Sequence, residues 1–255
     1  MAARLGKRGL FADALALAAD LIWPPRSLLS EAIVTRPGAI EPELWGRLVF
    51  LSTPCCFRCG FPFENEAGEE AVCGSCAADP PVFHRARAAL AYDDLSRDLV
   101  LDLKHAGRRD GLPAFASWMA HAAGPLAAEA DLIVPAPLHW TRLASRRFNQ
   151  AAWLAQALAR RCGKPIAYAA LARVKRAPSQ AGLNPDQRRR NVVGAFRVPK
   201  SSRKLVAGKA ILLVDDVYTT GATAEACARA LLRAGAARAD VVTLARVVRP
   251  AGGLI

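Results

Sequence analysis

The chain has 255 residues, 53% of them hydrophobic, and its 35 basic side chains exceed its 22 acidic ones to give a formal net charge of +13. The apolar content excludes wholesale disorder, and the length suits one medium-sized domain with a small one beside it. The basic surplus favours anionic partners, namely nucleic acid, phosphorylated small molecules or acidic membranes, although a GC-rich genome also enriches arginine.

The first 22 residues are expected to form an amphipathic helix. Apolar side chains recur there at helical spacing, and Asp13 and Asp20 interrupt the apolar run, which is unlike a secretory signal peptide. Pro24 and Pro25 end the helix. The sequence holds no uncharged apolar run of about 18 residues, so we expect no membrane span.

Five of the seven cysteines lie between residues 55 and 76. Cys56 with Cys59 and Cys73 with Cys76 form two C-x₂-C pairs separated by 13 residues. Four thiolates at this spacing suit a closed, tetrahedral, structural Zn²⁺ site. Cys55 directly precedes Cys56 and could replace it as a ligand, so the choice between them stays open. Free thiolates at a metal site fit a reducing compartment, and we therefore expect a cytoplasmic protein.

A boundary is expected after Pro81, which divides the chain into an N-terminal helix with the cysteine module (residues 1–81) and a larger domain (residues 82–255). Strands and helices alternate in the larger domain, which predicts a mostly parallel sheet covered by helices on both faces. The expected strands are 86–92, 132–134, 194–198, 210–214 and 241–245, the helices are 95–104, 112–123, 149–162 and 223–234, and residues 172–191 form a basic, polar loop.

The segment 211–223 carries the strongest functional signal. Four apolar residues form a buried strand, and Asp215 and Asp216 follow at the strand end where open α/β sheets bind ligands. A short loop of hydroxyl and glycine residues then begins a helix, and its backbone N–H groups suit a phosphate. Because carboxylates repel phosphate, the two acids indicate that sugar hydroxyls or a bridging Mg²⁺ lie beside it. The alternative, a helix capped by a threonine, requires neither acid.

This segment resembles the ribose-phosphate signature of type I phosphoribosyltransferases. The resemblance implies that Asp215 and Asp216 contact the ribose hydroxyls of 5-phosphoribosyl-1-pyrophosphate (PRPP), bound with Mg²⁺, and that the loop holds the 5′-phosphate. The loop residues so implied are Thr219, Thr220, Gly221, Ala222 and Thr223.

Nearly the whole chain resembles the ComF family of competence and phosphoribosyltransferase-like proteins. The matching motifs lie at residues 103–107, 134–139, 146–150, 179–183 and 188–191. The resemblance implies a type I phosphoribosyltransferase-like α/β domain behind a small N-terminal zinc-ribbon module. It also implies that pyrophosphate or nucleic acid contacts Lys104, Ala136, Pro137, Arg142, Arg146 and Arg147. A solvated basic surface is the alternative for the charged members of this set.

The family usually carries two zinc ribbons, and the first is degraded in this chain. Ser27, Ser30, Glu41 and Leu44 stand where its two C-x₂-C pairs are expected. These side chains cannot form a thiolate site, so we expect one structural Zn²⁺ rather than two.

Two functions fit these observations. One is a phosphoribosyltransferase with a role in competence and DNA uptake, in which Mg²⁺ and arginines stabilise the leaving pyrophosphate. The other is a non-catalytic protein on the same fold that senses PRPP or binds single-stranded DNA and contacts DNA-uptake proteins. A third and weaker hypothesis is an accessory protein whose ribbon docks a protein partner.

Overall fold

The computed structural model describes residues 24–103, 109–139, 148–175 and 192–248. The chain divides into two compact units, residues 1–47 and 48–255. The cysteine segment belongs to the second unit because Ala86 N donates to Arg58 O (2.7 Å) and the Arg58 guanidinium donates to Phe83 O (3.0 Å). The division expected at residues 81 and 82 stays a prediction, and the expected helix over residues 1–22 lies outside the described residues.

Residues 24–47 of the first unit form a small turn structure followed by a short helix. Arg26 pairs with Ile33 in an antiparallel bridge, and helix α2 (Pro42–Trp45) comes after it. Glu41 is the N-terminal cap residue of α2 and has an extended backbone. No hydrophobic side chain of α2 is fully buried.

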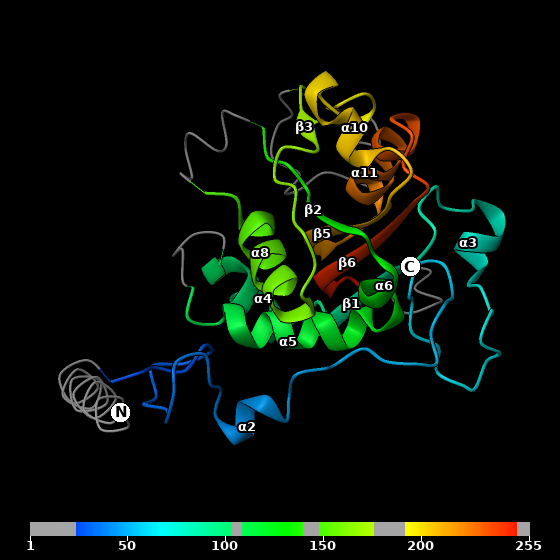
Figure 1. Cartoon of the computed structure of the whole chain (residues 1–255). Helices are drawn as coiled ribbons and strands as arrows, with labels where there is room; N and C mark the ends of the chain where they lie inside the picture. The colour runs from blue at the N-terminus through cyan, green and yellow to red at the C-terminus, as the bar shows by residue number, and fades with distance from the viewer. Residues whose placement is uncertain (1–23, 104–108, 140–147, 176–191, 249–255) are drawn as a thin grey trace, which may run out of the picture. The chain divides into compact units, whose positions relative to one another are not determined.

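Four parallel strands form the sheet of the second unit, in the order β1-β6-β5-β2 (Figure 1). The strands are β1 (Ala86–Ala91), β2 (Leu132–Pro135), β5 (Ala210–Tyr218) and β6 (Arg238–Arg246). The two central strands consist mostly of buried residues, because both of their faces are covered. A separate antiparallel pair is formed by β3 (Ala172–Arg173) and β4 (Phe196–Arg197).

Helices cover both faces of the sheet. Two of them, α5 and α8, contact each other and the strands. On the other face, Ile211 and Leu213 of β5 share a core with Cys227 and Leu231 of α11. The helices are α3 (Gly74–Ala78), α4 (Asp94–Leu101), α5 (Leu112–Ala123), α6 (Pro125–Glu129), α8 (Gln150–Cys162), α10 (Arg203–Val206) and α11 (Ala222–Arg233), with a 3₁₀ turn at Lys200–Ser202.

The chain changes direction across the sheet between β2 and β5. After β2, helix α8 leads to Ile166, which bridges Ile133 on the side of β2 away from β5. After β5, helix α11 leads to β6 in the opposite direction. Right-handed crossovers in opposite directions place α8 and α11 on opposite faces. The C-terminal ends of β2 and β5 therefore form the topological switch point, where open α/β sheets bind ligands.

The expected fold class is confirmed, and the bounds of several elements differ from the expected ones. Strand β5 continues to Tyr218 rather than ending at residue 214, because its ladder with β6 runs on to the pair Tyr218 and Arg246. Asp215 and Asp216 therefore both lie inside a hydrogen-bonded strand. The strand expected over 194–198 is reduced to the two residues of β4.

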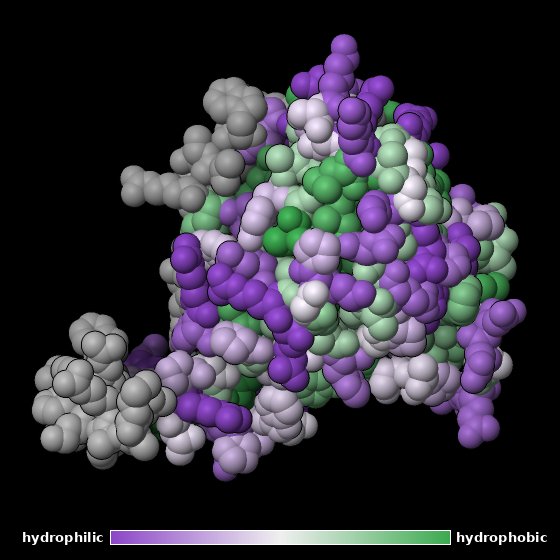
Figure 2. All heavy atoms as spheres, in the orientation of Figure 1, coloured by the Kyte–Doolittle hydropathy of each residue, from purple (hydrophilic) through white to green (hydrophobic). Residues whose placement is uncertain are grey.

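The surface is mixed in character. Figure 2 shows hydrophilic side chains over most of the face in view and apolar side chains gathered in its upper part. Within the described ranges, no helix combines the length and the apolar composition that crossing a bilayer requires.

Candidate functional site

The two acids at the end of β5 are held by hydrogen bonds at the switch point. Asp216 is only 7% exposed, and its Oδ2 accepts a hydrogen bond from Gln150 Nε2 at 2.8 Å. Its Oδ1 accepts from the backbone N–H of Val217 at 2.7 Å. Asp215 is less buried, and its Oδ1 accepts from the N–H of Asp216 at 2.9 Å. Both carboxylates therefore have defined orientations before any ligand binds.

Two neighbouring residues at the start of α8 join the two strand ends of the switch point. Asn149 caps α8, because its Oδ1 accepts from Ala151 N at 3.1 Å, and its Nδ2 donates to Ala136 O at 3.1 Å. Gln150, which is 4% exposed, holds Asp216. Residues 146–150 match a family motif in the sequence, but that match assigned no role to Asn149 or Gln150. The Asn N-cap is the signal that could have located the first of them.

The loop after β5 presents an uncapped helix N-terminus. Gly221 is the cap residue of α11 with a φ of 77°, and no side chain caps the helix. This excludes the alternative of an ordinary threonine cap. The first N–H groups of a helix without a capping side chain form an anion-binding site. Among the described residues, the buried Thr220 Oγ1 has no hydrogen-bond partner, so its hydrogen-bonding capacity is unused.

Gly221 is required by its surroundings as well as by its backbone angle. A Cβ atom at this position would lie 2.4 Å from the Tyr218 hydroxyl. Tyr218 is fixed in turn, because its ring contacts Phe83 edge-on at 6.2 Å and the Arg246 guanidinium lies 4.9 Å from its centroid. Burial raises the pKa of Tyr218, so the phenol stays neutral beside an anion site.

The pyrophosphate and nucleic-acid candidates are only partly described. Ala136 is buried at the end of β2, where its N–H donates to Val214 O at 2.8 Å, and Pro137 follows it. These two residues therefore lie beside β5 at the switch point. Four basic candidates lie outside the described residues: Lys104, Arg142, Arg146 and Arg147.

An aromatic stack includes Arg109 and Phe148, the described residues that follow the segments containing these four basic candidates in the sequence. The Arg109 guanidinium is 4.1 Å from the ring centroid of Trp153, and Phe148 stacks on Trp153 with centroids 4.2 Å apart. Residues 104–108 run directly into Arg109, and residues 140–147 run directly into Phe148. Trp153 lies on α8, one turn from Gln150, so Arg109 and Phe148 contact α8 close to the switch point.

The four cysteines of the two C-x₂-C pairs form one cluster. The sulfur atoms of Cys56, Cys59, Cys73 and Cys76 all lie within 4.8 Å of one another, and Cys59 Sγ and Cys73 Sγ are 3.7 Å apart. Tetrahedral coordination with Zn–S bonds of about 2.3 Å requires sulfurs about 3.8 Å apart. The donor set and its spacing therefore fit a structural Zn²⁺. Cys55 is not part of the cluster.

The thiols of this cluster have uneven acidities when no cation is bound. Burial raises the pKa of Cys59 to about 11 and also raises the pKa of Cys76. Burial would also raise the pKa of Cys56, but the N–H groups of Cys73 and Cys59 donate to its sulfur and bring the pKa to about 7. Four thiolates at neutral pH thus need the positive charge of a metal ion.

One buried arginine connects the cysteine cluster to residues 219–223, which we name the phosphate loop for the ligand that the sequence predicts there. Arg246, which is 5% exposed, donates a hydrogen bond to Cys59 O. Its guanidinium also lies 5.5 Å from the Phe61 ring and 4.9 Å from the Tyr218 ring. Since Tyr218 contacts the Gly221 position, the chain of contacts runs from the cysteines to the start of α11. No motif or spacing in the sequence singles out Arg246 from the other arginines.

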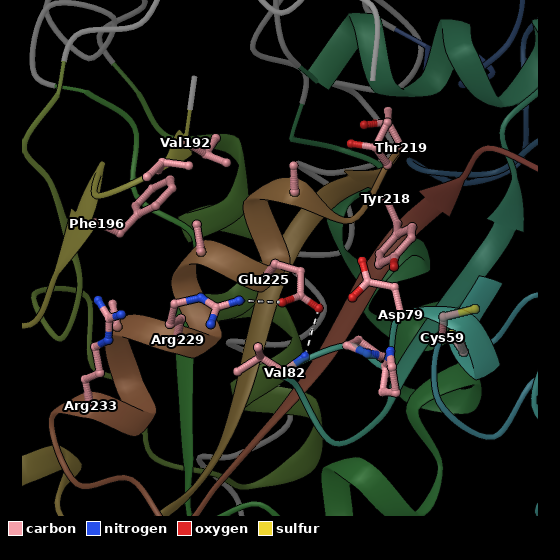
Figure 3. Close-up of a pocket in the computed structure, with 18 of the residues that line it drawn as sticks. Cys59, Asp79, Val82, Val192, Phe196, Tyr218, Thr219, Glu225, Arg229 and Arg233 are labelled. Carbon is pink, nitrogen blue, oxygen red and sulfur yellow. Dashed lines mark hydrogen bonds and ion pairs between the residues drawn. The ribbon is translucent and has the colours of Figure 1, made fainter. Parts of the chain in front are cut away.

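A cavity of about 850 Å³ opens beside the phosphate loop on the side of the cysteine module (Figure 3). Thr219 and Thr220 line it together with one side of α11, the segment 79–82 and β4. Glu225 of α11 joins two of its walls, because its carboxylate accepts a hydrogen bond from Val82 N at 2.9 Å (Figure 3). Glu225 also pairs with Arg229 of the same helix at 3.5 Å (Figure 3). The phosphate loop therefore borders a cavity on the side of the cysteine module.

Two known domain families match this chain. The phosphoribosyl transferase domain matches residues 149–252, and the double zinc ribbon domain matches residues 18–77. The fold and the site thus define a phosphoribosyltransferase-like domain preceded by a double zinc ribbon.

Three similar proteins show to which family within this class the chain belongs. The DNA utilization protein YhgH of Salmonella typhi is 35% identical over 201 residues, covering 76% of this chain and 84% of that one. Competence protein F of Haemophilus influenzae is 35% identical over 116 residues, 46% of this chain and 50% of that one. Competence protein ComFC of Bacillus subtilis is 29% identical over 199 residues, 75% of this chain and 77% of that one. The chain belongs to this ComF family, as the sequence motifs predicted.

Substitution of Gly221 tests the geometry of the loop. Gly221→Ala should lower the free energy of unfolding by more than the roughly 1–2 kcal/mol that a left-handed backbone costs a residue with a Cβ, because Tyr218 must also move. Gly163→Ala is the matched control: its φ is 63°, and a Cβ there meets nothing within 4 Å. Urea unfolding measures both variants. Equal losses would show that the Tyr218 contact does not constrain the loop.

Substitution of the adjacent cysteines tests the metal site. Cys56→Ser should reduce the zinc content of the purified protein and destabilise it, since the serine hydroxyl is a poor zinc ligand. Cys55→Ser should retain the zinc content of the wild type. Elemental analysis with thermal unfolding measures both variants, and zinc loss in Cys55→Ser would contradict the assigned ligand set.

Substitution of Gln150 tests its hold on Asp216. Gln150→Leu removes a hydrogen bond to a carboxylate, which is worth about 1.5–3 kcal/mol. It should weaken binding of PRPP, the ligand that the sequence predicts for this site, about tenfold or more. Gln156→Leu, on the same helix, should bind like the wild type. A Gln150→Leu protein that is folded and binds PRPP with unchanged affinity would show that Gln150 does not position the acid.

Proposed function

We propose that the domain binds PRPP with Mg²⁺ at the switch point between β2 and β5. The observation that carries the proposal is the uncapped N-terminus of α11 directly after two hydrogen-bonded carboxylates. An anion site and a pair of acids a few residues apart suit a ligand that offers a phosphate and vicinal hydroxyls together. PRPP has both, and a simple phosphate ion has only the first.

Each part of the site has a role in this proposal. The N–H groups of Ala222 and Thr223, with the Thr220 hydroxyl, bind the 5′-phosphate. Asp215 and Asp216 accept hydrogen bonds from the ribose hydroxyls. The backbone at Ala136 and Pro137 binds the pyrophosphate, and Mg²⁺ neutralises part of its charge.

A transferase activity would use the same residues for charge and orientation. In phosphoribosyl transfer the bond between ribose C1 and the pyrophosphate oxygen breaks, a nucleophile forms a bond to C1, and pyrophosphate leaves with the electron pair. Positive charge develops on the ribose and negative charge on the leaving group. Fixed carboxylates beside the sugar stabilise the positive charge on the ribose, and basic side chains near the pyrophosphate stabilise the negative charge on the leaving group.

The cellular role that fits this chain best is the handling of DNA during uptake, in a reducing cytoplasm. Relatives carry the names DNA utilization protein and competence protein, and the net charge of +13 favours a polyanionic partner. A second candidate function is therefore single-stranded DNA binding without catalysis. Since binding to DNA phosphates weakens steeply with salt, a steep salt dependence of the affinity for single-stranded DNA would identify this second function.

Neutralising the acids tests the proposed function. Asp215→Asn with Asp216→Asn should abolish PRPP binding in a calorimetric titration with Mg²⁺, because amides cannot replace two ionised acceptors, while circular dichroism shows a retained fold. Asp98→Asn, an exposed acid on α4, serves as the control and should bind like the wild type.

The same titration separates the two candidate functions. Single-stranded DNA should bind the double variant as well as it binds the wild type if its phosphates contact arginines elsewhere. PRPP binding by the double variant with wild-type affinity would refute the site. Release of pyrophosphate from PRPP in the presence of an acceptor would establish the enzyme, and its absence with every nitrogen nucleophile tried would favour the binding protein.

A further inference from the structure

The region matched by the double zinc ribbon contains the same backbone pattern twice. The first copy lies in residues 24–47 and holds Ser27, Ser30, Glu41 and Leu44. The second lies in residues 54–79 and holds Cys56, Cys59, Cys73 and Cys76. Each copy has two pairs of positions with two residues between the members of a pair.

Several backbone hydrogen bonds of the first copy have counterparts at the same positions of the second. The first ligand position is Ser27 in the first copy and Cys56 in the second. In each copy the residue before it forms a β-bridge with the residue seven positions later. The N–H of the first ligand position donates to the carbonyl five positions later. The following N–H donates to the carbonyl two residues before the third position. These bonds are Ser27 N to Ala32 O (2.9 Å) and Leu28 N to Ala39 O (3.1 Å) in the first copy, and Cys56 N to Phe61 O (2.7 Å) and Phe57 N to Ala71 O (2.8 Å) in the second.

The second half of each copy also corresponds. Glu41 is the extended cap residue of α2, and Cys73 is the extended cap residue of α3. Leu44 and Cys76 are each the third residue of the helix that follows. The first copy therefore has the complete framework of a zinc knuckle with none of its cysteines.

A carboxylate lies where the first copy would bring its ligands together. Ser27 Oγ donates to one oxygen of Glu41, and Ser30 Oγ donates to the other. The serine oxygens also accept backbone N–H groups, from Leu29 at 3.2 Å and from Ala32 at 3.0 Å. Ser27 is fully buried. The two hydroxyls hold the pKa of Glu41 below its usual value, which keeps both oxygens available as acceptors.

We propose that Glu41 replaces the metal ion of the first ribbon. A zinc ion in a ribbon joins one cysteine pair to the other, and here the Glu41 carboxylate joins the Ser27 and Ser30 turn to the start of α2. Leu44, at the fourth position, carries no ligand atom. Two neutral hydroxyls and one carboxylate are a poor donor set for Zn²⁺, which prefers thiolate and imidazole in structural sites. The double ribbon thus holds one zinc, in its second copy, and the first copy folds without metal.

Restoring the cysteines gives the sharpest test. The variant Ser27→Cys/Ser30→Cys/Glu41→Cys/Leu44→Cys should bind two zinc ions per chain by elemental analysis, and the wild type should bind one. Two zincs in the wild type would overturn the proposal. A folded variant with only one zinc would also overturn it, because the framework of the first copy would then not be that of a zinc knuckle.

Removing the carboxylate tests the replacement itself and does not depend on the fourfold variant folding. Glu41→Ala should raise amide hydrogen exchange across residues 27–45 by about tenfold or more, for two lost hydrogen bonds to a charged group, while zinc content stays at one. Glu43→Ala, an exposed acid on α2, is the matched control. Equal exchange in the two variants would overturn the role of Glu41.

Chelation of the wild type completes the test. Removal of zinc should expose residues 54–79 to exchange and leave residues 27–45 as protected as before. Loss of protection in both copies at the same chelator concentration would contradict a metal-free first copy.

Discussion

The candidate site depends on a conflict between charges that are only a few residues apart. Asp215 and Asp216 are negative, and the start of α11 is built to attract an anion. The fold reconciles them by keeping the acids inside the ladder of β5 with β6 and turning the chain at Gly221. A ligand with hydroxyls at one end and a phosphate at the other satisfies both groups. The position is given by topology, since β2 and β5 end where the chain changes direction across the sheet.

The cysteine module supports this site rather than standing apart from it. Arg246 lies between the carbonyl of Cys59 and the ring of Tyr218, whose hydroxyl fills the space in which a Cβ of residue 221 would lie. A metal at the second ribbon copy therefore stabilises residues that touch the phosphate loop. This arrangement gives the ribbon a structural reason to be joined to a phosphoribosyltransferase-like domain. In the first copy, we propose that a carboxylate joins the turns in place of a metal ion.

Much of the fold could be predicted from the sequence, because alternating apolar patterns reveal strands and helices and the two acids directly follow a buried strand. The cysteine pairs were equally clear, and the structure selects Cys56 over Cys55. The contacts of Gln150 with Asp216 and of Arg246 with Cys59 could not be predicted, because they join residues 66 and 187 positions apart. The spacing of residue types along the chain does not indicate such long-range contacts. The extension of β5 was missed because Asp disfavours strands, and here the partner strand overrides that preference. Lys104, Arg142, Arg146 and Arg147 remain predictions.

The most direct test of PRPP binding at the switch point between β2 and β5 is a crystal structure of the protein with PRPP and Mg²⁺. We expect the 5′-phosphate to lie within hydrogen-bond distance of the N–H groups of Ala222 and Thr223, and the ribose hydroxyls to contact Asp215 and Asp216. A PRPP molecule bound elsewhere, with the start of α11 free of phosphate, would contradict it.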